Sequence, residues 1–163
     1  MTLGAPSPID GSHDVSAFSC GHPSLDDWLK RRALANHKSG ASRTFVVCEK
    51  SRVVAYYALA AGAIACSEAT GRFRRNMPDP IPVAILARLA IDIAFQKRGL
   101  GRALFRDASH RILSAADGIG IRGLLVHAIS AEAANFYRAV GVEPSPADPQ
   151  TMMVTLADLQ ATL

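Results

Sequence analysis

The segment from Gln96 to Arg102 has the residue types of a phosphate-binding turn. A largely apolar stretch ends at Ile91, and the apolar pattern of a helix begins at Leu100. Backbone N–H groups are unpaired at the start of a helix, so they suit an anionic phosphate. Gly99 and Gly101 carry no Cβ, so a ligand can lie close to the backbone there. The cations of the segment are Lys97, Arg98 and Arg102.

Two other phosphate motifs do not fit this segment. A Walker loop needs Gly-Lys-Ser or Gly-Lys-Thr four residues after its first glycine, and no such triplet follows here. A dinucleotide fingerprint needs a third glycine, where this chain has Leu104. An ordinary strand-to-helix turn without a ligand is the remaining alternative.

The elements that position this segment follow from the apolar patterns. The predicted helices span 24–37, 99–116 and 131–140, and the predicted strands span 43–49, 53–66, 81–91, 122–128 and 152–155. Residues 1–12 are expected to be loose with one short strand, 67–80 a surface loop or short helix, and the end of the chain a helical turn. Ser24 is the expected cap of the first helix, Ser51 and Arg52 form the expected hairpin turn, and the helix after Ala131 stops at Gly141.

This order of elements predicts an α/β fold, a mixed central β-sheet flanked by helices. The strands at 81–91 and 122–128 are joined by a helix and should be parallel. Ligands bind at the carboxyl ends of such strands, so the glycine segment and Ser130 should share one edge of the sheet. The length of 163 residues suits a single domain spanning residues 1–163.

Two motifs resemble the GCN5-related N-acetyltransferase (GNAT) superfamily. The spacing Gln-x-x-Gly-x-Gly in Gln96–Gly101 is similar to its acetyl-CoA pyrophosphate loop, and ANFYRAVGV in 134–142 is similar to its A-x-x-F-Y-x-x-x-G-F segment, with Val142 in place of Phe. The resemblance implies a GNAT fold whose parallel central strands splay around acetyl-CoA. The expected acetyl-CoA-binding residues are Leu89, Ala90, Ile91, Gln96, Lys97, Arg98, Gly99, Leu100, Gly101, Arg102 and Ser130.

Tyr137 is the expected catalytic residue. Acetyl transfer needs a free amine, a donor for the carbonyl oxyanion and a proton for the departing thiolate. A phenol with a pKa of about 10 stays protonated at pH 7 and can protonate a thiolate whose thiol has a pKa of about 8.5. Backbone N–H groups around Ala90 and Ile91 could polarise the thioester carbonyl. Alternatively, Phe136 and Tyr137 are core aromatics.

No strong general base is evident in the sequence. Asp92, Glu49 and Glu68 are candidates, although Asp92 could instead cap the loop after its strand. The five histidines and Cys66 have no spacing diagnostic of a nucleophilic triad, and the three cysteines fit neither a disulfide framework nor a zinc site. Direct transfer to an amine is therefore the simpler mechanism, with no metal.

The N-terminal half narrows the resemblance. Phe18-x-Cys20-Gly21, Leu25-Asp26-x-Trp28-Leu29 and the segment from Gly40 to Val47 look like the acetyltransferase toxins of type II toxin–antitoxin modules. This resemblance implies acetylation of the α-amino group of aminoacyl-tRNA, inhibition of translation, silencing by a ribbon-helix-helix antitoxin encoded nearby, and a homodimer. An α-amino group has a pKa of roughly 7.7 to 8.0, well below the value of about 10.4 for a lysine side chain. A site without a strong general base therefore suits an α-amino substrate better than a lysine substrate.

Charge and composition are compatible with a polyanionic partner. The net charge is +4, and fourteen of the 18 basic residues are Arg, which suits bidentate phosphate contacts. Arg72, Arg74 and Arg75 are the expected RNA contacts, with Phe73 as a stacking residue; a solvated basic loop is the alternative. The longest apolar run, 53–66, is shorter than the ~20 residues of a membrane span, and no signal peptide is evident, so we expect a cytoplasmic protein.

Three competing functions stay open from the sequence. The chain could be a GNAT enzyme that acetylates a small amine or a protein amine. It could also be a CoA-binding regulatory module, or an RNA-binding protein without turnover. Tyr137 together with an intact glycine segment argues against the last two.

Overall fold

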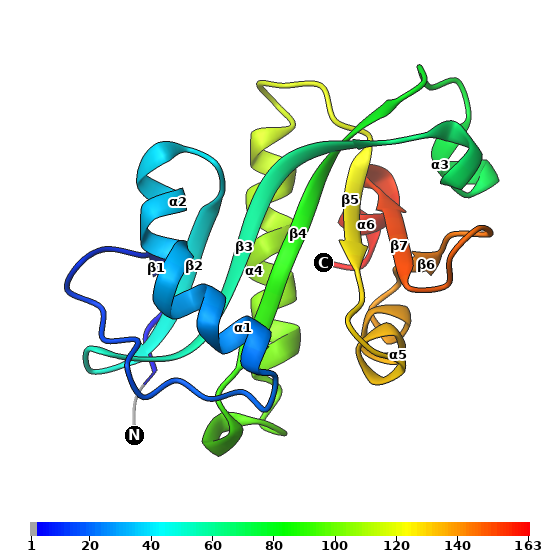
Figure 1. Cartoon of the computed structure of the whole chain (residues 1–163). Coiled ribbons are helices and arrows are strands. Elements are labelled where there is room, and N and C mark those ends of the chain that lie inside the picture. The colour runs from blue at the N-terminus through cyan, green and yellow to red at the C-terminus, as the bar shows by residue number, and fades with distance from the viewer. Residues whose placement is uncertain (1–2) are drawn as a thin grey trace. The chain divides into compact units, whose positions relative to one another are not determined.

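The computed structural model describes residues 3–163. They form an α/β fold with a mixed seven-stranded sheet in the order β1-β2-β3-β4-β5-β7-β6 (Figure 1). The strands are β1 (Ser7–Pro8), β2 (Arg43–Glu49), β3 (Arg52–Ile64), β4 (Ile81–Ile91), β5 (Gly123–His127), β6 (Glu143–Pro144) and β7 (Thr151–Thr155). The α-helices are α1 (Pro23–Trp28), α2 (Leu34–Ser39), α3 (Gly71–Arg74), α4 (Leu100–Ala115), α5 (Ala131–Ala139) and α6 (Leu156–Ala161).

The chain divides into two units. The first contains the described residues up to Ala60 together with Ala87–Asp107, and the second contains Ala61–Leu86 and Ala108–Leu163. β3, β4 and α4 each contribute residues to both units, so the division does not follow the boundaries of the elements.

The core of the first unit forms where helices cover β2 and β3. α1, a π-helical segment (Leu29–Ala33) and α2 follow one another without a break (Figure 1). Leu25 and Leu29 from this run are buried in one cluster with Val46 and Tyr56 of the strands. The phenol of Tyr56 donates a hydrogen bond to the backbone oxygen of Leu25 at 2.7 Å, which anchors the start of the helical run on β3.

The predicted cap of this helical run is wrong. The cap residue is His22, and Pro23 stands in the first helical position, one residue before Ser24. Proline suits that position because its φ is already helical and its missing N–H would have had no partner there. The run ends at Gly40, whose φ of 86° is left-handed, three residues beyond the predicted end at 37.

The turn between β2 and β3 also differs from the prediction by one residue. Lys50 and Ser51 form the turn, and Arg52 is already the first residue of β3. Lys50 has a φ of 57°, a conformation that L-residues other than Asn, Asp and Gly rarely adopt. Residue preferences therefore could not place this turn, whereas the pairing of Glu49 with Arg52 does.

The second unit contains the predicted parallel pair. β4 and β5 run parallel, with Leu86 opposite Val126 at the end of the pairing, and β7 lies antiparallel to β5. Gly123 permits the close approach of β7, because a Cβ there would lie 2.0 Å from the backbone oxygen of Val154. β6 was not predicted; its two residues pair with Met152 and Met153.

The remaining elements agree with the sequence to within one or two residues. The short first strand, the short helix within 67–80, the stop of α5 before Gly141 and the helical end of the chain are confirmed. Within residues 3–163, no helix combines the length and apolarity required to cross a bilayer.

Candidate active site

The loop that leads into α4 has the backbone expected of an anion site. Lys97 and Gly99 both have left-handed φ values, 63° and 79°, on either side of Arg98. Alternation of the sign of φ is typical of the concave anion-binding nests that successive backbone N–H groups form. Gly99 accepts the hydrogen bond of Ala103 at 3.2 Å, so α4 begins here and its first N–H groups have no helical partner.

Gln96 holds this loop in place through its side chain. Its Nε2 donates to the backbone oxygen of Ile91 at 2.8 Å and to that of Cys20 at 3.0 Å. Both donor hydrogens of the amide are thereby used within the protein. The Gln of the Gln-x-x-Gly-x-Gly spacing therefore fastens the loop to the end of β4, a positioning role that the sequence does not reveal.

Asp92 caps the turn after β4. Its carboxylate accepts from the N–H groups of Ala94 at 3.0 Å and Ser19 at 3.1 Å, and the guanidinium of Arg52 lies 3.4 Å away. The side chain is 5 % exposed. A buried carboxylate with three donors around it stabilises the loop, which favours the capping interpretation over a general base.

The other loop residues are open to a ligand. Lys97, Gly99 and Arg102 are exposed, and a Cβ built on Gly99 meets no atom within 4 Å. The guanidinium of Arg98 lies over the ring of Phe95, 5.2 Å from its centroid. At the end of β4, Ala90 is buried and its neighbours Leu89 and Ile91 are half-buried. The first unit thus brings together the predicted acetyl-CoA residues from Leu89 to Arg102.

Tyr137 and Ser130 lie on α5 in the second unit. The hydroxyl of Ser130 caps this helix by accepting the N–H of Ala133 at 3.1 Å, so the first turn of α5 is fixed next to the end of β5. Tyr137 is buried, with 6 % of its surface exposed, and its ring packs edge-on against Phe136. Burial raises the pKa of the Tyr137 phenol above its ordinary value, so it stays protonated at neutral pH.

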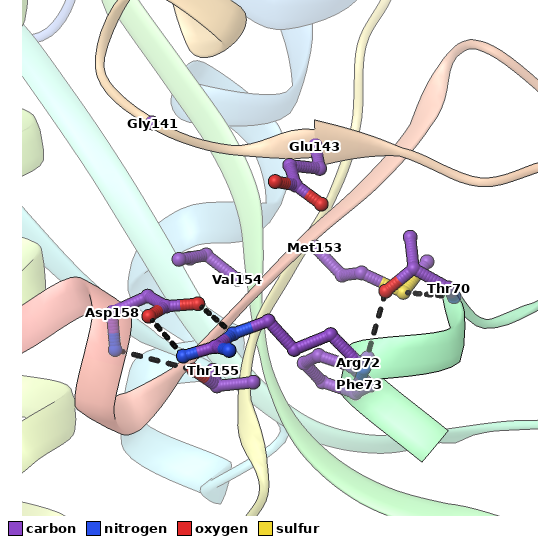
Figure 2. Close-up of a pocket in the computed structure, with 9 residues that line it drawn as sticks. All are labelled: Thr70, Arg72, Phe73, Gly141, Glu143, Met153, Val154, Thr155 and Asp158. Atoms are coloured by element: carbon purple, nitrogen blue, oxygen red, sulfur yellow. Dashed lines mark hydrogen bonds and ion pairs between the residues drawn. The ribbon is translucent and has the colours of Figure 1, made fainter. Parts of the chain in front are cut away.

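The arginines in and directly after α3 have different environments. Arg72 makes a bidentate ion pair with Asp158 of α6 at 2.5 and 2.7 Å (Figure 2). Arg74 and Arg75 are exposed. The expectation that Phe73 stacks on RNA is wrong, because Phe73 is 1 % exposed and packs in the core of the second unit. The helical turn places Phe73 on the inner side of α3, which a count of charges along the chain cannot show.

A pocket of about 140 Å³ lies within the second unit. Residues from β3, β4, β5 and the loop before β7 line it, and three of them carry ionisable side chains: Glu68, His127 and Asp148. Only Glu68 was a candidate from the sequence. His127 is the last residue of β5, and the carboxyl end of a parallel strand is the signal that could have found it.

Comparison with known proteins identifies the family of this chain. The family model described as "Acetyltransferase (GNAT) domain" matches residues 40–144. A protein of Mycobacterium tuberculosis (strain ATCC 25618 / H37Rv) named "tRNA-acetylating toxin" is 53 % identical over 159 residues, which cover 98 % of this chain and 96 % of that protein. A protein of Sinorhizobium fredii (strain NBRC 101917 / NGR234) named "Probable toxin TacT" is 27 % identical over 168 residues. The match covers 96 % of this chain and 93 % of that protein.

Three solved structures share the fold. A mutant of KacT matches with a TM-score of 0.92 at 22 % identity, covering 100 % of both chains. A mutant of the toxin AtaT bound to the C-terminus of the antitoxin AtaR matches with a TM-score of 0.84 at 24 % identity, covering 98 % of this chain and 96 % of that one. AtaTR bound with AcCoA matches with a TM-score of 0.84 at 25 % identity and the same coverage.

Proposed function

Because the chain belongs to the GNAT acetyltransferase family, we propose that it is the toxin of a type II toxin–antitoxin module that acetylates aminoacyl-tRNA. It transfers the acetyl group of acetyl-CoA to the α-amino group of the aminoacyl ester, and the acetylated product inhibits translation. The observation that carries this proposal is the 53 % identity, over nearly the whole chain, to a protein named tRNA-acetylating toxin.

The glycine loop is the proposed site of the acetyl-CoA pyrophosphate. Its support is the alternating φ of Lys97, Arg98 and Gly99, together with the N–H groups at the start of α4, which have no partner within the helix. Gln96 positions this loop instead of binding the ligand with its amide. The exposed cations Lys97 and Arg102 add attraction for the phosphates.

Tyr137 is the proposed proton donor. The amine nitrogen attacks the thioester carbonyl carbon, and the tetrahedral intermediate expels the CoA thiolate, which takes the phenolic proton of Tyr137. The proton that the nitrogen loses on forming the amide restores the phenol. Burial supports this role, since the raised pKa keeps the phenol protonated over the pH range in which the amine is free. N–H groups at the end of β4, around Leu89 to Ile91, polarise the carbonyl oxygen.

Arg74 and Arg75 are the proposed contacts to the tRNA backbone. They are exposed, whereas the guanidinium of Arg72 is paired with Asp158 and holds α3.

We further infer that both units work as one acetyltransferase domain. We also infer that the enzyme acts in the cytoplasm as a homodimer and that a ribbon-helix-helix antitoxin silences it. The inference of an antitoxin partner is supported by the fold shared with AtaT, a toxin solved in complex with the C-terminus of the antitoxin AtaR.

The decisive experiment incubates the purified enzyme with labelled acetyl-CoA and with charged or uncharged tRNA. We expect label on the charged tRNA alone, and base hydrolysis of the ester should release an N-acetylated amino acid. Label on uncharged tRNA, or only on small amines or protein lysines, overturns the proposal and favours an acetyltransferase of another amine.

A further inference from the structure

The pocket of the second unit combines an apolar wall with a polar end. The wall consists of Ala63, Ile64, Ile85 and Leu125, and the polar end holds Glu68, His127, Asp148 and Thr151. Its volume of about 140 Å³ far exceeds the roughly 10–15 Å³ that one water molecule requires. An organic group the size of an amino-acid residue fits such a space.

The polar end is ordered by a chain of hydrogen bonds. Nδ1 of His127 lies 3.2 Å from the hydroxyl oxygen of Thr151. That hydroxyl donates to Oδ2 of Asp148 at 3.0 Å, and Oδ1 of Asp148 accepts the N–H of Gln150 at the same distance. The hydrogen bond from Gln150, reinforced by that from Thr151, lowers the pKa of Asp148, so Asp148 is ionised at neutral pH and only accepts.

These bonds determine which nitrogen of His127 is basic. The one hydroxyl proton of Thr151 points to the Asp148 carboxylate, so the Thr151 oxygen can only accept from the imidazole. Nδ1 of neutral His127 therefore carries the hydrogen, and Nε2 has the free lone pair. Since His127 is exposed, Nε2 can take a proton from a ligand and release it to water.

The position of His127 fits this use. It directly follows Val126, which forms the last pair of the parallel strands β4 and β5 with Leu86, and ligands bind at the carboxyl ends of such strands. The titratable groups lining the pocket besides His127 are the carboxylic acids Glu68 and Asp148. Carboxylates attract an ammonium group, while the apolar wall suits the carbon atoms attached to it.

We propose that this pocket receives the aminoacyl group of the acceptor tRNA and that His127 is the general base that removes a proton from its α-ammonium group. The proposal rests on the function proposed above. Nε2 of His127 takes the proton, the amine nitrogen forms the new bond to the acetyl carbonyl carbon, and the bond from that carbon to sulfur breaks. CoA leaves as the thiol with a proton from Tyr137. The second proton that the nitrogen must lose to become the amide returns Tyr137 to its phenol form, and His127 releases its proton to water.

The test compares pH profiles of kcat/KM for aminoacyl-tRNA between the wild-type enzyme and His127→Gln. Glutamine keeps a polar side chain of similar size but cannot accept the ammonium proton. We expect a loss of about 100-fold at pH 7. The loss should shrink above pH ~8, where the α-amino group is already unprotonated in solution.

A second pair of variants isolates the hydrogen-bond chain. Thr151→Val removes the hydroxyl that orients His127, and Thr151→Ser keeps it. The valine variant should lose activity with the same pH signature, and serine should restore most of it. Thermal unfolding and acetyl-CoA affinity, measured on each variant, separate this effect from misfolding; if His127→Gln does not fold, the Thr151 pair decides.

The outcomes distinguish the two proposals. A wild-type enzyme that does not acetylate aminoacyl-tRNA contradicts the proposed function itself. If the wild type does acetylate it, and folded His127→Gln either matches the wild type or loses the same factor at every pH, only the role of His127 is overturned.

Discussion

The two units of this protein present their functional groups in different ways. In the first unit, the loop from Gln96 to Arg102 offers backbone N–H groups, and its ordered side chains serve the loop: Gln96 fastens it to Ile91 and Cys20, and Asp92 caps the turn before it. In the second unit, the proposed chemistry depends on side chains. The phenol of Tyr137 and the imidazole of His127 belong to this unit, as do the exposed Arg74 and Arg75.

This difference determines how each unit tolerates substitution. A backbone site depends on a conformation, so it is damaged by residues that cannot adopt a positive φ or that add charge or bulk. A side-chain site depends on individual functional groups, so it is damaged by removal of a single atom. The following variants test that contrast.

Tyr137→Phe should show the largest effect, because it removes one oxygen atom and leaves the ring in the core. Loss of a positioned proton donor lowers kcat by roughly 10²–10⁴-fold. Single-turnover acetylation of aminoacyl-tRNA measures this loss, and acetyl-CoA affinity should not change. Turnover at the wild-type rate would mean that Tyr137 only packs.

Gly99→Asp should weaken acetyl-CoA binding on the order of 100-fold, because a carboxylate next to a phosphate is repelled. Gly99→Asn is the matched control: it has the same size and the same tolerance of the left-handed φ of 79°, but no charge. Calorimetry should show the asparagine variant within about tenfold of the wild type. Equal affinities for the two variants would remove the pyrophosphate from this loop.

Replacement of both Arg74 and Arg75 by alanine should reduce tRNA affinity on the order of tenfold. If each arginine neutralises one phosphate, the slope of log affinity against log salt should decrease by about 0.7–0.9 per residue. Acetyl-CoA affinity serves as the internal control and should not change. An unchanged salt slope would assign these two arginines to a solvated surface.

Arg72→Ala should show the smallest effect on catalysis and a small effect on stability. Its ion pair with Asp158 is exposed and screened by water, so we expect the unfolding midpoint to fall by a few degrees at neutral pH. The hydrogen bond from Arg72 lowers the pKa of Asp158 in the folded protein. The stabilisation is therefore complete above the ordinary carboxyl pKa of 3.8 and is lost as the pH falls through the lower folded value. Thermal unfolding of both proteins between pH 7 and pH 3 should show the difference constant at neutral pH and shrinking once the pH falls below 3.8.

Local patterns of residues identified the parts of this protein that depend on nearby residues. The apolar runs predicted β4, β5 and the helix between them, and Gly99 marked the loop before that helix, because strand and helix periods and the positive φ of a glycine are local properties. The N-terminal helix is a partial exception. Its observed cap is His22 and not the predicted Ser24, because Pro23 suits the first helical position.

Only the tertiary structure decided how individual side chains are used. Arg72 and Phe73 look like members of one basic, aromatic segment, yet Asp158, 86 residues away, pairs with the first, and the core of the second unit buries the other. His127, Thr151 and Asp148 show no spacing in the chain that links them. The antiparallel pairing of β5 with β7 sets His127 opposite Thr151, and the loop before β7 brings Asp148 to its hydroxyl. The loop from Gln96 to Arg102 could be predicted from the sequence because its backbone geometry arises within a few residues. Side-chain partners that are distant in sequence meet only when the sheet forms.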